Sequence, residues 1–242
     1  MLLDFFKTAL HPGFFDGACD MHSHLLPGVD DGFLDFDKTM EGIAFMKRLG
    51  FRKVKMTPHF MKDYPNNTRA NIEAKYQDFL SKAGDNLSVE LSLGAEYMLD
   101  SCFMDHFEDG FITIDVNNTL ILCETSYMNS DPKASEMLYR AMLKGYQPII
   151  AHPERYNYAS MAMYHRWKEK DYLFQLNLLS LSGAYGDMAK AKARALLKAG
   201  MYDYVGSDLH RIGDPNKMFY SIRLSNKERD QLEILLGNNE KL

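Results

Sequence analysis

The chain has 242 residues, of which 46% are hydrophobic and 25% charged, and its formal net charge is −5. This length fits one large domain and can bury a core without disulfides or a structural metal. The acidic balance argues against nucleic-acid binding. Three distant cysteines without a CxxC pair suit a reducing compartment. No signal-peptide pattern and no apolar run of about 18 residues stand out, so we expect a cytoplasmic protein without membrane insertion.

Short strand-like runs alternate with longer helical segments along the chain. Strands are expected at 18–21, 52–57, 88–93, 119–123, 147–151, 173–178 and 202–206. Helices are expected at 35–49, 68–83, 130–144, 159–170, 187–199 and 225–236. Thr68 and Ser225 are candidate N-caps, and Gly50 is a candidate helix terminator. About seven βα units in series predict an α/β fold with a largely parallel sheet, either open or closed into a barrel.

Potential metal ligands stand at the ends of six of the expected strands. These residues are His22, His24, His59, Glu96, Glu124, His152, Asp208 and His210. In a βα barrel the carboxyl ends of the strands face one another, whereas opposite edges of an open sheet could not share one site. The distribution of these residues around all the units therefore favours a barrel.

Two pairs of these residues have the spacing of neighbours on one face of a strand, His22-x-His24 and Asp208-x-His210. A single strand-end histidine is more often a hydrogen-bonded structural residue, and a single carboxylate can cap a helix. Burying several carboxylates together without cations would be costly, however, so the set as a whole indicates a metal site. The remaining histidines are expected to take no part: His11, His106 and His165.

The number of ligands predicts more than one metal ion. With Asp31 included, the set exceeds what one zinc (about four ligands) or one manganese or iron (up to about six) requires. Two or three divalent ions are expected, and a set without cysteine suits manganese, iron or zinc. Four carboxylates, three such ions and a bridging hydroxide leave a net charge of about +1, to which Arg155 and Arg211 add. That charge suits a phosphate ester, with the hydroxide as nucleophile and Arg155 neutralising the transferred group.

Five motifs between residues 18 and 215 carry a family resemblance. They are Asp20-Met-His-Ser-His-Leu-Leu-Pro-Gly-Val-Asp-Asp-Gly32, Thr57-Pro-His59, Gly94-Ala-Glu96, Ala151-His-Pro-Glu-Arg155 and Ser207-Asp-Leu-His210. In order and spacing they resemble a PHP (polymerase and histidinol phosphatase) domain. Within that superfamily the chain is most similar to the bacterial tyrosine-protein phosphatases of capsule and exopolysaccharide loci, the CpsB/YwqE type. The first and fourth motifs are specific to this subgroup.

The resemblance implies a distorted, TIM-like (β/α)7 barrel that spans residues 1–242 as a single domain and holds a trinuclear centre, with manganese as the first choice of metal. It assigns one metal to His22, His24, Glu96 and Asp208. It assigns a second to Glu96, Glu124 and His152. It assigns the third to Asp31, His59 and His210, with Asp30 as the alternative to Asp31. Arg155 matches a phosphate-binding arginine of the family, and Arg211 approximately matches a second one.

The resemblance also implies a substrate. Family members remove phosphate from tyrosines of a cognate autophosphorylating kinase and thereby regulate polysaccharide synthesis. No cysteine of this chain is followed six residues later by arginine, so a C-x5-R thiol mechanism does not apply. A small-molecule phosphatase, acting on histidinol phosphate or a nucleotide, and an inactive metal-binding regulator remain the alternatives. Aromatic residues after the strand ends are expected mainly to pack on the barrel rim, although one could flank a phosphotyrosine ring: Phe60, Tyr64, Tyr127, Tyr156, Tyr158 and Tyr185.

Overall fold

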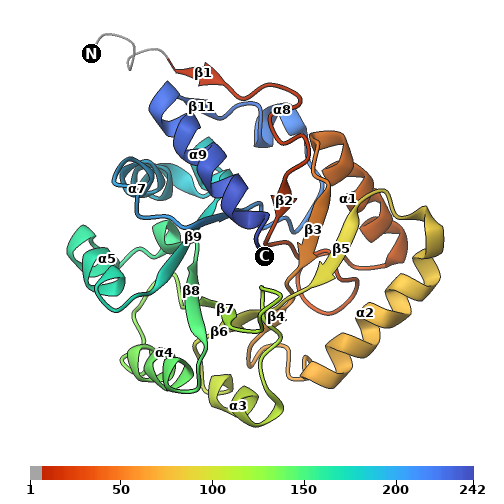
Figure 1. The fold of residues 1–242 in the computed structure, drawn as a ribbon, viewed down its shortest axis with the longest axis vertical. Helices are drawn as coiled ribbons and strands as arrows, with labels where there is room; N and C mark the ends of the chain where they lie inside the picture. Colours follow the sequence, from red (N-terminus) through yellow and green to blue (C-terminus); the bar gives the residue numbers. More distant parts are fainter. Residues whose placement is uncertain (1–6) are drawn as a thin grey trace.

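The computed structural model describes residues 7–242, in which parallel strands form a barrel surrounded by helices (Figure 1). A six-stranded sheet has the order β10-β9-β8-β7-β6-β4, and a three-stranded sheet has the order β2-β3-β5. The strands of the barrel are β2 (Cys19–Asp20), β3 (Lys53–Met56), β4 (His59–Phe60), β5 (Glu90–Leu93), β6 (Glu96–Met98), β7 (Leu120–Glu124), β8 (Gln147–Ala151), β9 (Leu173–Asn177) and β10 (Tyr204–Gly206). All pairs within these two sheets are parallel.

The two sheets join into one closed barrel. The chain passes from β3 to β4 through two residues, and from β5 to β6 in the same way, so the nine strands occupy seven positions around the barrel. Closure comes next to β2 and β10, where Ser23 and Leu209 form a parallel bridge. The His24 N–H donates to the Leu209 carbonyl, and the Asp208 N–H donates to the His22 carbonyl. The prediction of an α/β fold built as a distorted barrel is confirmed.

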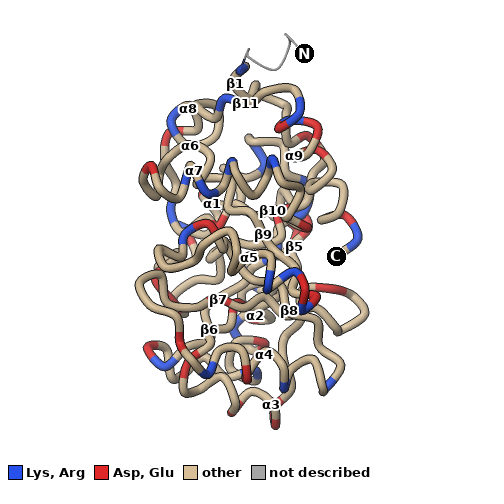
Figure 2. The backbone as a smooth tube through the Cα atoms, turned by 90° about the vertical axis from the view of Figure 1, so that its left-hand side faces the viewer, with Lys and Arg blue, Asp and Glu red and all other residues tan. Residues whose placement is uncertain are grey.

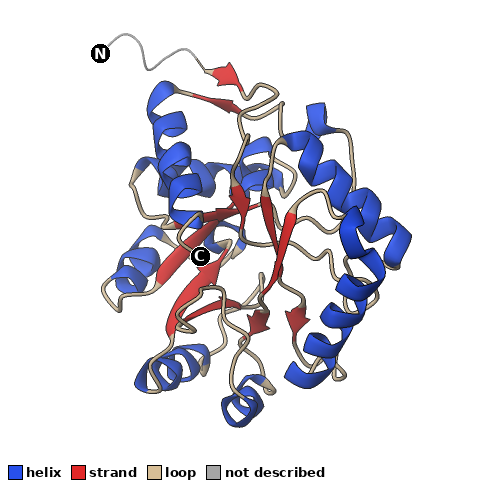
Figure 3. Ribbon diagram, turned by 45° about the vertical axis from the view of Figure 1, so that its right-hand side comes forward, coloured by secondary structure: helices blue, strands red, loops and turns tan. Residues whose placement is uncertain are grey.

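Helices surround the strands on the outside (Figure 3). They are α1 (Phe36–Leu49), α2 (Arg69–Ala83), α3 (His106–Asp109), α4 (Ala134–Leu143), α5 (Met161–Lys168), α6 (Leu178–Ser182), α7 (Gly186–Lys198), α8 (Pro215–Met218) and α9 (Asn226–Asn239). The predicted N-caps are confirmed, because the Thr68 hydroxyl accepts from the Asn71 N–H and Ser225 forms a capping box with Glu228. Gly50 ends α1 with φ 108°, in the left-handed region that glycine tolerates.

The sequence pattern misplaces or omits several short elements. Helix α4 begins at Ala134 and not at 130, because Asp131 accepts a hydrogen bond from the Lys133 N–H in a turn that contains Pro132. The antiparallel pair β1 (Thr8–Ala9) and β11 (Arg223–Leu224) has no periodicity to reveal it. Helices α3, α6 and α8 have at most five residues, too few for a helical hydrophobic pattern.

Two groups of buried apolar residues fill the fold. The larger packs the outer faces of the strands against the helices. The smaller fills the barrel interior and consists of Met21, Ile114, Leu122, Ile149, Ala151 and Leu242. Leu242 reaches the middle of the barrel from α9 (Figure 1) and packs near the first residues of β7, β9 and β10. The amino ends of the strands are thereby covered, so the carboxyl ends are the open side.

Charged residues of both signs are interspersed along the helices and loops of the molecule (Figure 2). Within residues 7–242, no helix is long and apolar enough to cross a membrane.

Candidate metal centre

The predicted ligands converge at the carboxyl ends of the strands. The barrel strands or the residues directly after them carry His22, His24, His59, Glu96, Glu124, His152, Asp208 and His210. All but His210 are buried, with at most 7% of each residue exposed. Asp31 reaches the same place from the loop between β2 and α1, and 57% of its side chain is exposed. The convergence follows from the parallel barrel, which gathers strand ends that are up to 188 residues apart in sequence.

Three overlapping groups of side chains offer ligand atoms that lie within 4.8 Å of one another. The first is His22, His24, Glu96 and Asp208; the second is His59, Glu96 and Glu124; the third is His24, Asp31, His59 and His210. The first group has the membership that the resemblance implied. The third also has the implied members, with His24 added. Glu96, His24 and His59 each belong to two groups, so the three form one continuous cluster.

The first group points its nitrogen and oxygen atoms at a common centre. His22 Nε2 lies 3.2 Å from His24 Nε2, 3.2 Å from Glu96 Oε2 and 3.3 Å from Asp208 Oδ1. His24 Nε2 lies 3.4 Å from Glu96 Oε2 and 3.3 Å from Asp208 Oδ1. Two imidazoles and two carboxylates at these separations form a set of the kind that manganese, iron and zinc accept.

The second group is arranged around two glutamates. His59 Nδ1 lies 3.1 Å from Glu96 Oε2 and 3.0 Å from Glu124 Oε1. His152 approaches the same carboxylates from the other side, with Nε2 3.0 Å from Glu96 Oε1 and 3.8 Å from Glu124 Oε2. The implied trio of Glu96, Glu124 and His152 is therefore brought together, and His59 stands between this group and the third.

The geometry separates the roles of the two neighbouring aspartates. Asp31 Oδ1 lies 3.5 Å from His59 Nε2 and 3.4 Å from His210 Nε2, which places its carboxylate in the third group. Asp30 turns the other way, and its Oδ2 accepts from His24 Nδ1 at 2.8 Å and from the His59 N–H at 3.1 Å. Asp31 is thus the candidate ligand, and Asp30 orients His24.

Two polar residues of β9 that the sequence reasoning missed support the cluster. Gln175 Oε1 lies 3.0 Å from His22 Nδ1 and accepts from the His152 N–H at 3.3 Å. Asn177 donates to Asp208 Oδ2 at 2.8 Å. A signal for both was present, because they are the only polar side chains in an otherwise apolar strand and stand two residues apart. Such outer partners fix the tautomer and direction of a metal-ligating histidine.

Arg155 is held beside the cluster on three sides. Its Nη1 donates to Asp208 Oδ2 at 2.7 Å. Its guanidinium carbon lies 4.4 Å from the centre of the Tyr127 ring and 4.0 Å from that of the Tyr185 ring. Because Arg155 and Asn177 occupy Oδ2, Asp208 Oδ1 is left to face His22 and His24. The predicted arginine is therefore rigid and adjacent to the candidate ligands.

Arg211, the second predicted arginine, borders the same cavity as Arg155. This cavity, of about 420 Å³, is also lined by Asp31, Tyr185, Asp208 and His210. Of the other aromatics, Tyr64 stacks on His59 with a ring separation of 6.1 Å, whereas Phe60 and Tyr156 are fully buried in the core. Tyr158 packs on Tyr156. The expectation of mainly rim packing therefore holds for few of the six, because two are core residues and Tyr127 and Tyr185 contact Arg155.

The pKa values of the cluster show mutual stabilisation of opposite charges. Burial alone would lower the pKa of His22, but the carboxylates of Glu96 and Asp208 outweigh it and raise that pKa. Burial would raise the pKa of Glu96, yet His22 and His152 hold it well below its usual value. A hydrogen bond with His210 lowers the pKa of Asp31 to about 2. Glu96 and Asp31 are therefore ionised at neutral pH, the state in which carboxylates bind cations.

The buried polar atoms of the cluster fit metal binding. Within residues 7–242, seven buried side-chain polar atoms have no hydrogen-bond partner. Five of them belong to the cluster: His59 Nδ1, Glu96 Oε2, Glu124 Oε1, His152 Nδ1 and Asp208 Oδ1. Unpartnered buried atoms are costly, and cations bound in the cluster would remove that cost for all of these atoms except His152 Nδ1, because His152 faces the glutamates through Nε2. His152 (φ 33°) and Asp208 (φ 53°) also adopt left-handed backbone conformations, a strain that concentrates at functional sites.

Residues outside the cluster have other functions. Asp20, which precedes His22, accepts hydrogen bonds from the Ser207 N–H and hydroxyl and so connects β2 to the segment that carries Asp208.

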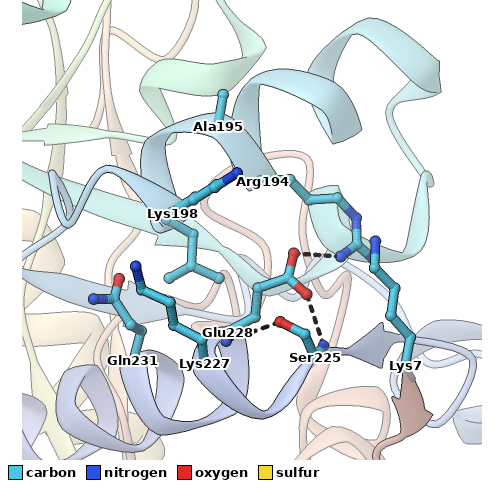
Figure 4. A pocket seen from close by; sticks show the side chains of 9 residues that line it. Lys7, Arg194, Ala195, Lys198, Ser225, Lys227, Glu228 and Gln231 are labelled. Atoms are coloured by element: carbon cyan, nitrogen blue, oxygen red, sulfur yellow. Dashed lines mark hydrogen bonds and ion pairs between the residues drawn. The ribbon is translucent and has the colours of Figure 1, made fainter. Parts of the chain in front are cut away.

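A separate cavity of about 310 Å³ lies where α7 faces the start of α9 (Figure 4). Its basic lining residues are Lys7, Arg194, Lys198 and Lys227. It shares no residue with the His and carboxylate cluster.

Two curated relatives of the chain are tyrosine-protein phosphatases. Tyrosine-protein phosphatase YwqE of Bacillus subtilis (strain 168) is 29% identical over 201 residues, which cover 81% of this chain and 79% of the relative. Tyrosine-protein phosphatase CpsB of Streptococcus pneumoniae is 24% identical over 213 residues, which cover 80% of this chain and 83% of the relative.

Solved structures share the fold. One from a study of YwqE and CpsB, described as unique metal-dependent tyrosine phosphatases, has a TM-score of 0.78 at 24% identity and covers 92% of both chains. A variant of organophosphorus hydrolase from Deinococcus radiodurans has a TM-score of 0.52 at 13% identity, with coverage of 98% of this chain and 97% of that one. The family model for capsular polysaccharide synthesis proteins CpsB/CapC matches residues 18–240. The chain therefore belongs to the CpsB/CapC family of capsular polysaccharide synthesis.

Proposed function

We propose that this chain is a metal-dependent phosphotyrosine-protein phosphatase, folded as one domain over residues 1–242. It would act in the cytoplasm, and its substrate would be an autophosphorylated tyrosine kinase of a polysaccharide export system. The observation that carries the proposal is the convergence of three overlapping His and carboxylate groups beside a fixed arginine. The names of the relatives support the choice of phosphotyrosine as substrate.

The nine predicted ligands would hold two or three divalent cations, with manganese as the first candidate. They are His22, His24, Asp31, His59, Glu96, Glu124, His152, Asp208 and His210. Cations bound there supply Lewis-acid polarisation of phosphoryl oxygens and an activated water. The overlap at Glu96 suits a multinuclear site, because its Oε1 faces His152 whereas its Oε2 faces three other histidines.

Arg155 would bind the phosphoryl group. The Tyr127 and Tyr185 rings both contact the guanidinium, whose N–H groups lie in its own plane because the group is planar. Asp208 takes one of them, and the edge that remains is available to an anion in the cavity shared with Arg211. A donor fixed in advance in this way stabilises charge on the transferred group without reorganisation.

One experiment tests the proposal. Bound metals are counted in the purified protein, and release of phosphate is measured from a phosphotyrosyl peptide and from histidinol phosphate, with and without chelator. We expect metal-dependent cleavage of the peptide. Activity that survives complete metal removal contradicts the mechanism, and cleavage of histidinol phosphate alone contradicts the substrate.

Matched histidine variants locate the activity. His22→Ala should abolish turnover while the protein remains folded, because it removes a ligand at the centre of the first group. His165→Ala, on the exposed side of α5, should leave turnover unchanged. Equal activity in the two variants would mean that the reaction takes place elsewhere.

A further inference from the structure

Besides the cavity that contains Arg155, a second cavity adjoins the metal centre. It has a volume of about 570 Å³ and lies between the loop before α1 and the loop after β10. Asp31, His210 and Arg211 line both this cavity and the one that contains Arg155. The two cavities are therefore adjacent across a wall made of two candidate ligands and Arg211, and a chain whose phosphate lies beside Arg155 can extend over this wall toward the second cavity.

Two apolar side chains border this second cavity and face water. Leu34 is 79% exposed and Ile212 is 36% exposed. They come from the loops that carry Asp31 and His210, so their distance from the metal centre is set by the same backbone. An exposed leucine on its own is ordinary, but two aliphatic residues that flank a cavity adjacent to a candidate reaction site indicate a contact surface.

The loop that presents Leu34 is firmly held. The Gly28 N–H donates to the Phe33 carbonyl at 2.8 Å, and the Phe33 N–H donates to the His24 carbonyl at 3.2 Å. Gly32 leaves no room for a side chain, because an added Cβ would collide with the His24 backbone. Leu34 is thus pre-organised, which lowers the entropy cost of binding a partner.

The charges around the second cavity indicate the kind of partner. Lys38 is already paired with Glu41, with a separation of 2.9 Å between Nζ and Oε2. Arg211 makes no hydrogen bond or ion pair with any residue in the range 7–242. A free cation and two aliphatic side chains fit a polypeptide that places an apolar residue beside its phosphotyrosine. A small phosphate ester would be confined to the cavity of Arg155 and would leave Leu34 in water.

We propose that Leu34 and Ile212 form a subsite that binds an apolar residue next to the phosphotyrosine of the protein substrate. This inference rests on the proposed function and adds to it a determinant of substrate choice. The subsite contributes through burial of apolar surface. It should therefore act on peptides and proteins and have no effect on free phosphotyrosine.

The test uses the metal-loaded enzyme and a set of Gly-Ser peptides with one central phosphotyrosine, in which leucine is placed in turn at each neighbouring position. For the wild-type enzyme we expect leucine at one of these positions to raise kcat/KM about tenfold over the peptide without leucine. The gain should come from a lower KM, and its size corresponds to burial of about half a leucine side chain. The double variant Leu34→Ser/Ile212→Ser should lose that preference and hydrolyse free phosphotyrosine at the wild-type rate.

Controls separate the outcomes. Leu143→Ser and Ile234→Ser remove exposed aliphatic residues (69% and 62% exposed) from α4 and α9 and should retain the preference. Met128→Ser changes a different groove, beside Tyr127. If this variant lost the leucine preference while Leu34→Ser/Ile212→Ser kept it, the assignment of the subsite would be overturned. Cleavage without any leucine preference refutes the subsite alone. An enzyme that cleaves neither the peptides nor free phosphotyrosine refutes the proposed function and the subsite together.

Discussion

Replacing Asp30 with asparagine keeps the size of the side chain but removes its charge and one of its two acceptors. Oδ2 accepts from His24 Nδ1 and from the His59 N–H, and Oδ1 accepts from the Gly32 N–H at 3.0 Å. All three partners of the Asp30 carboxylate are N–H donors. In Asp30→Asn, the amide nitrogen that replaces one of the two oxygens is also a donor and would therefore face another donor. The His24 ring is then less firmly held in the tautomer that leaves Nε2 for a metal.

The size of the effect follows from this geometry. Loss of an orienting partner of a metal-ligating histidine typically weakens metal affinity by roughly 10- to 100-fold, or about 1.4–2.7 kcal/mol. Asp30→Asn should therefore bind its full complement of Mn²⁺ more weakly. Asp31→Asn removes a direct ligand of the third group and should bind one equivalent fewer, with little change in folding because this side chain is 57% exposed.

The assay is a titration of chelator-treated protein with Mn²⁺, with bound metal counted at saturation and the melting temperature recorded for each variant. The two positions are neighbours in sequence, so each variant serves as the control for the other. If Asp30→Asn lost an equivalent of metal while Asp31→Asn kept all of them, the roles assigned to the two carboxylates would be reversed and the reasoning wrong.

Three further predictions concern the phosphate site, the barrel interior and the first loop. Arg155→Ala should retain bound metal, because Asn177 still holds Asp208 Oδ2, but should weaken inhibition by inorganic phosphate at least about tenfold; unchanged inhibition contradicts the role of this arginine. Burial lowers the pKa of Lys55 to about 8, so between pH 8 and 10.5 the unfolded state binds more protons and stability rises with pH. Lys55→Met should therefore raise the free energy of unfolding at pH 7 by up to about 3 kcal/mol, as measured by denaturant unfolding. If this gain in stability did not shrink by pH 10.5, burial of the charged lysine would not be its cause. Gly32→Ala should lower both metal affinity and melting temperature, because its Cβ collides with the His24 backbone; wild-type values for both would show that the loop can relax.

The amino-acid sequence by itself determined the barrel and most of the candidate ligands. Alternating strand and helix patterns set the order of the elements, and capping residues such as Thr68 and Ser225 set helix starts, because these signals act over a few residues. The ligands were recognisable because parallel strands in a barrel end on one face, so that position along a strand predicts proximity in space.

Tertiary structure alone decided which atoms face the centre. Asp30 and Asp31 are indistinguishable as neighbours in sequence, and only the turn of the loop sends one to His24 and the other to His210. The two tyrosines that enclose Arg155 come from loops after different strands, and no local pattern relates them. Residue type and spacing are local properties, whereas the direction of a side chain in a loop depends on contacts with distant parts of the chain, and these exist only once the barrel has closed.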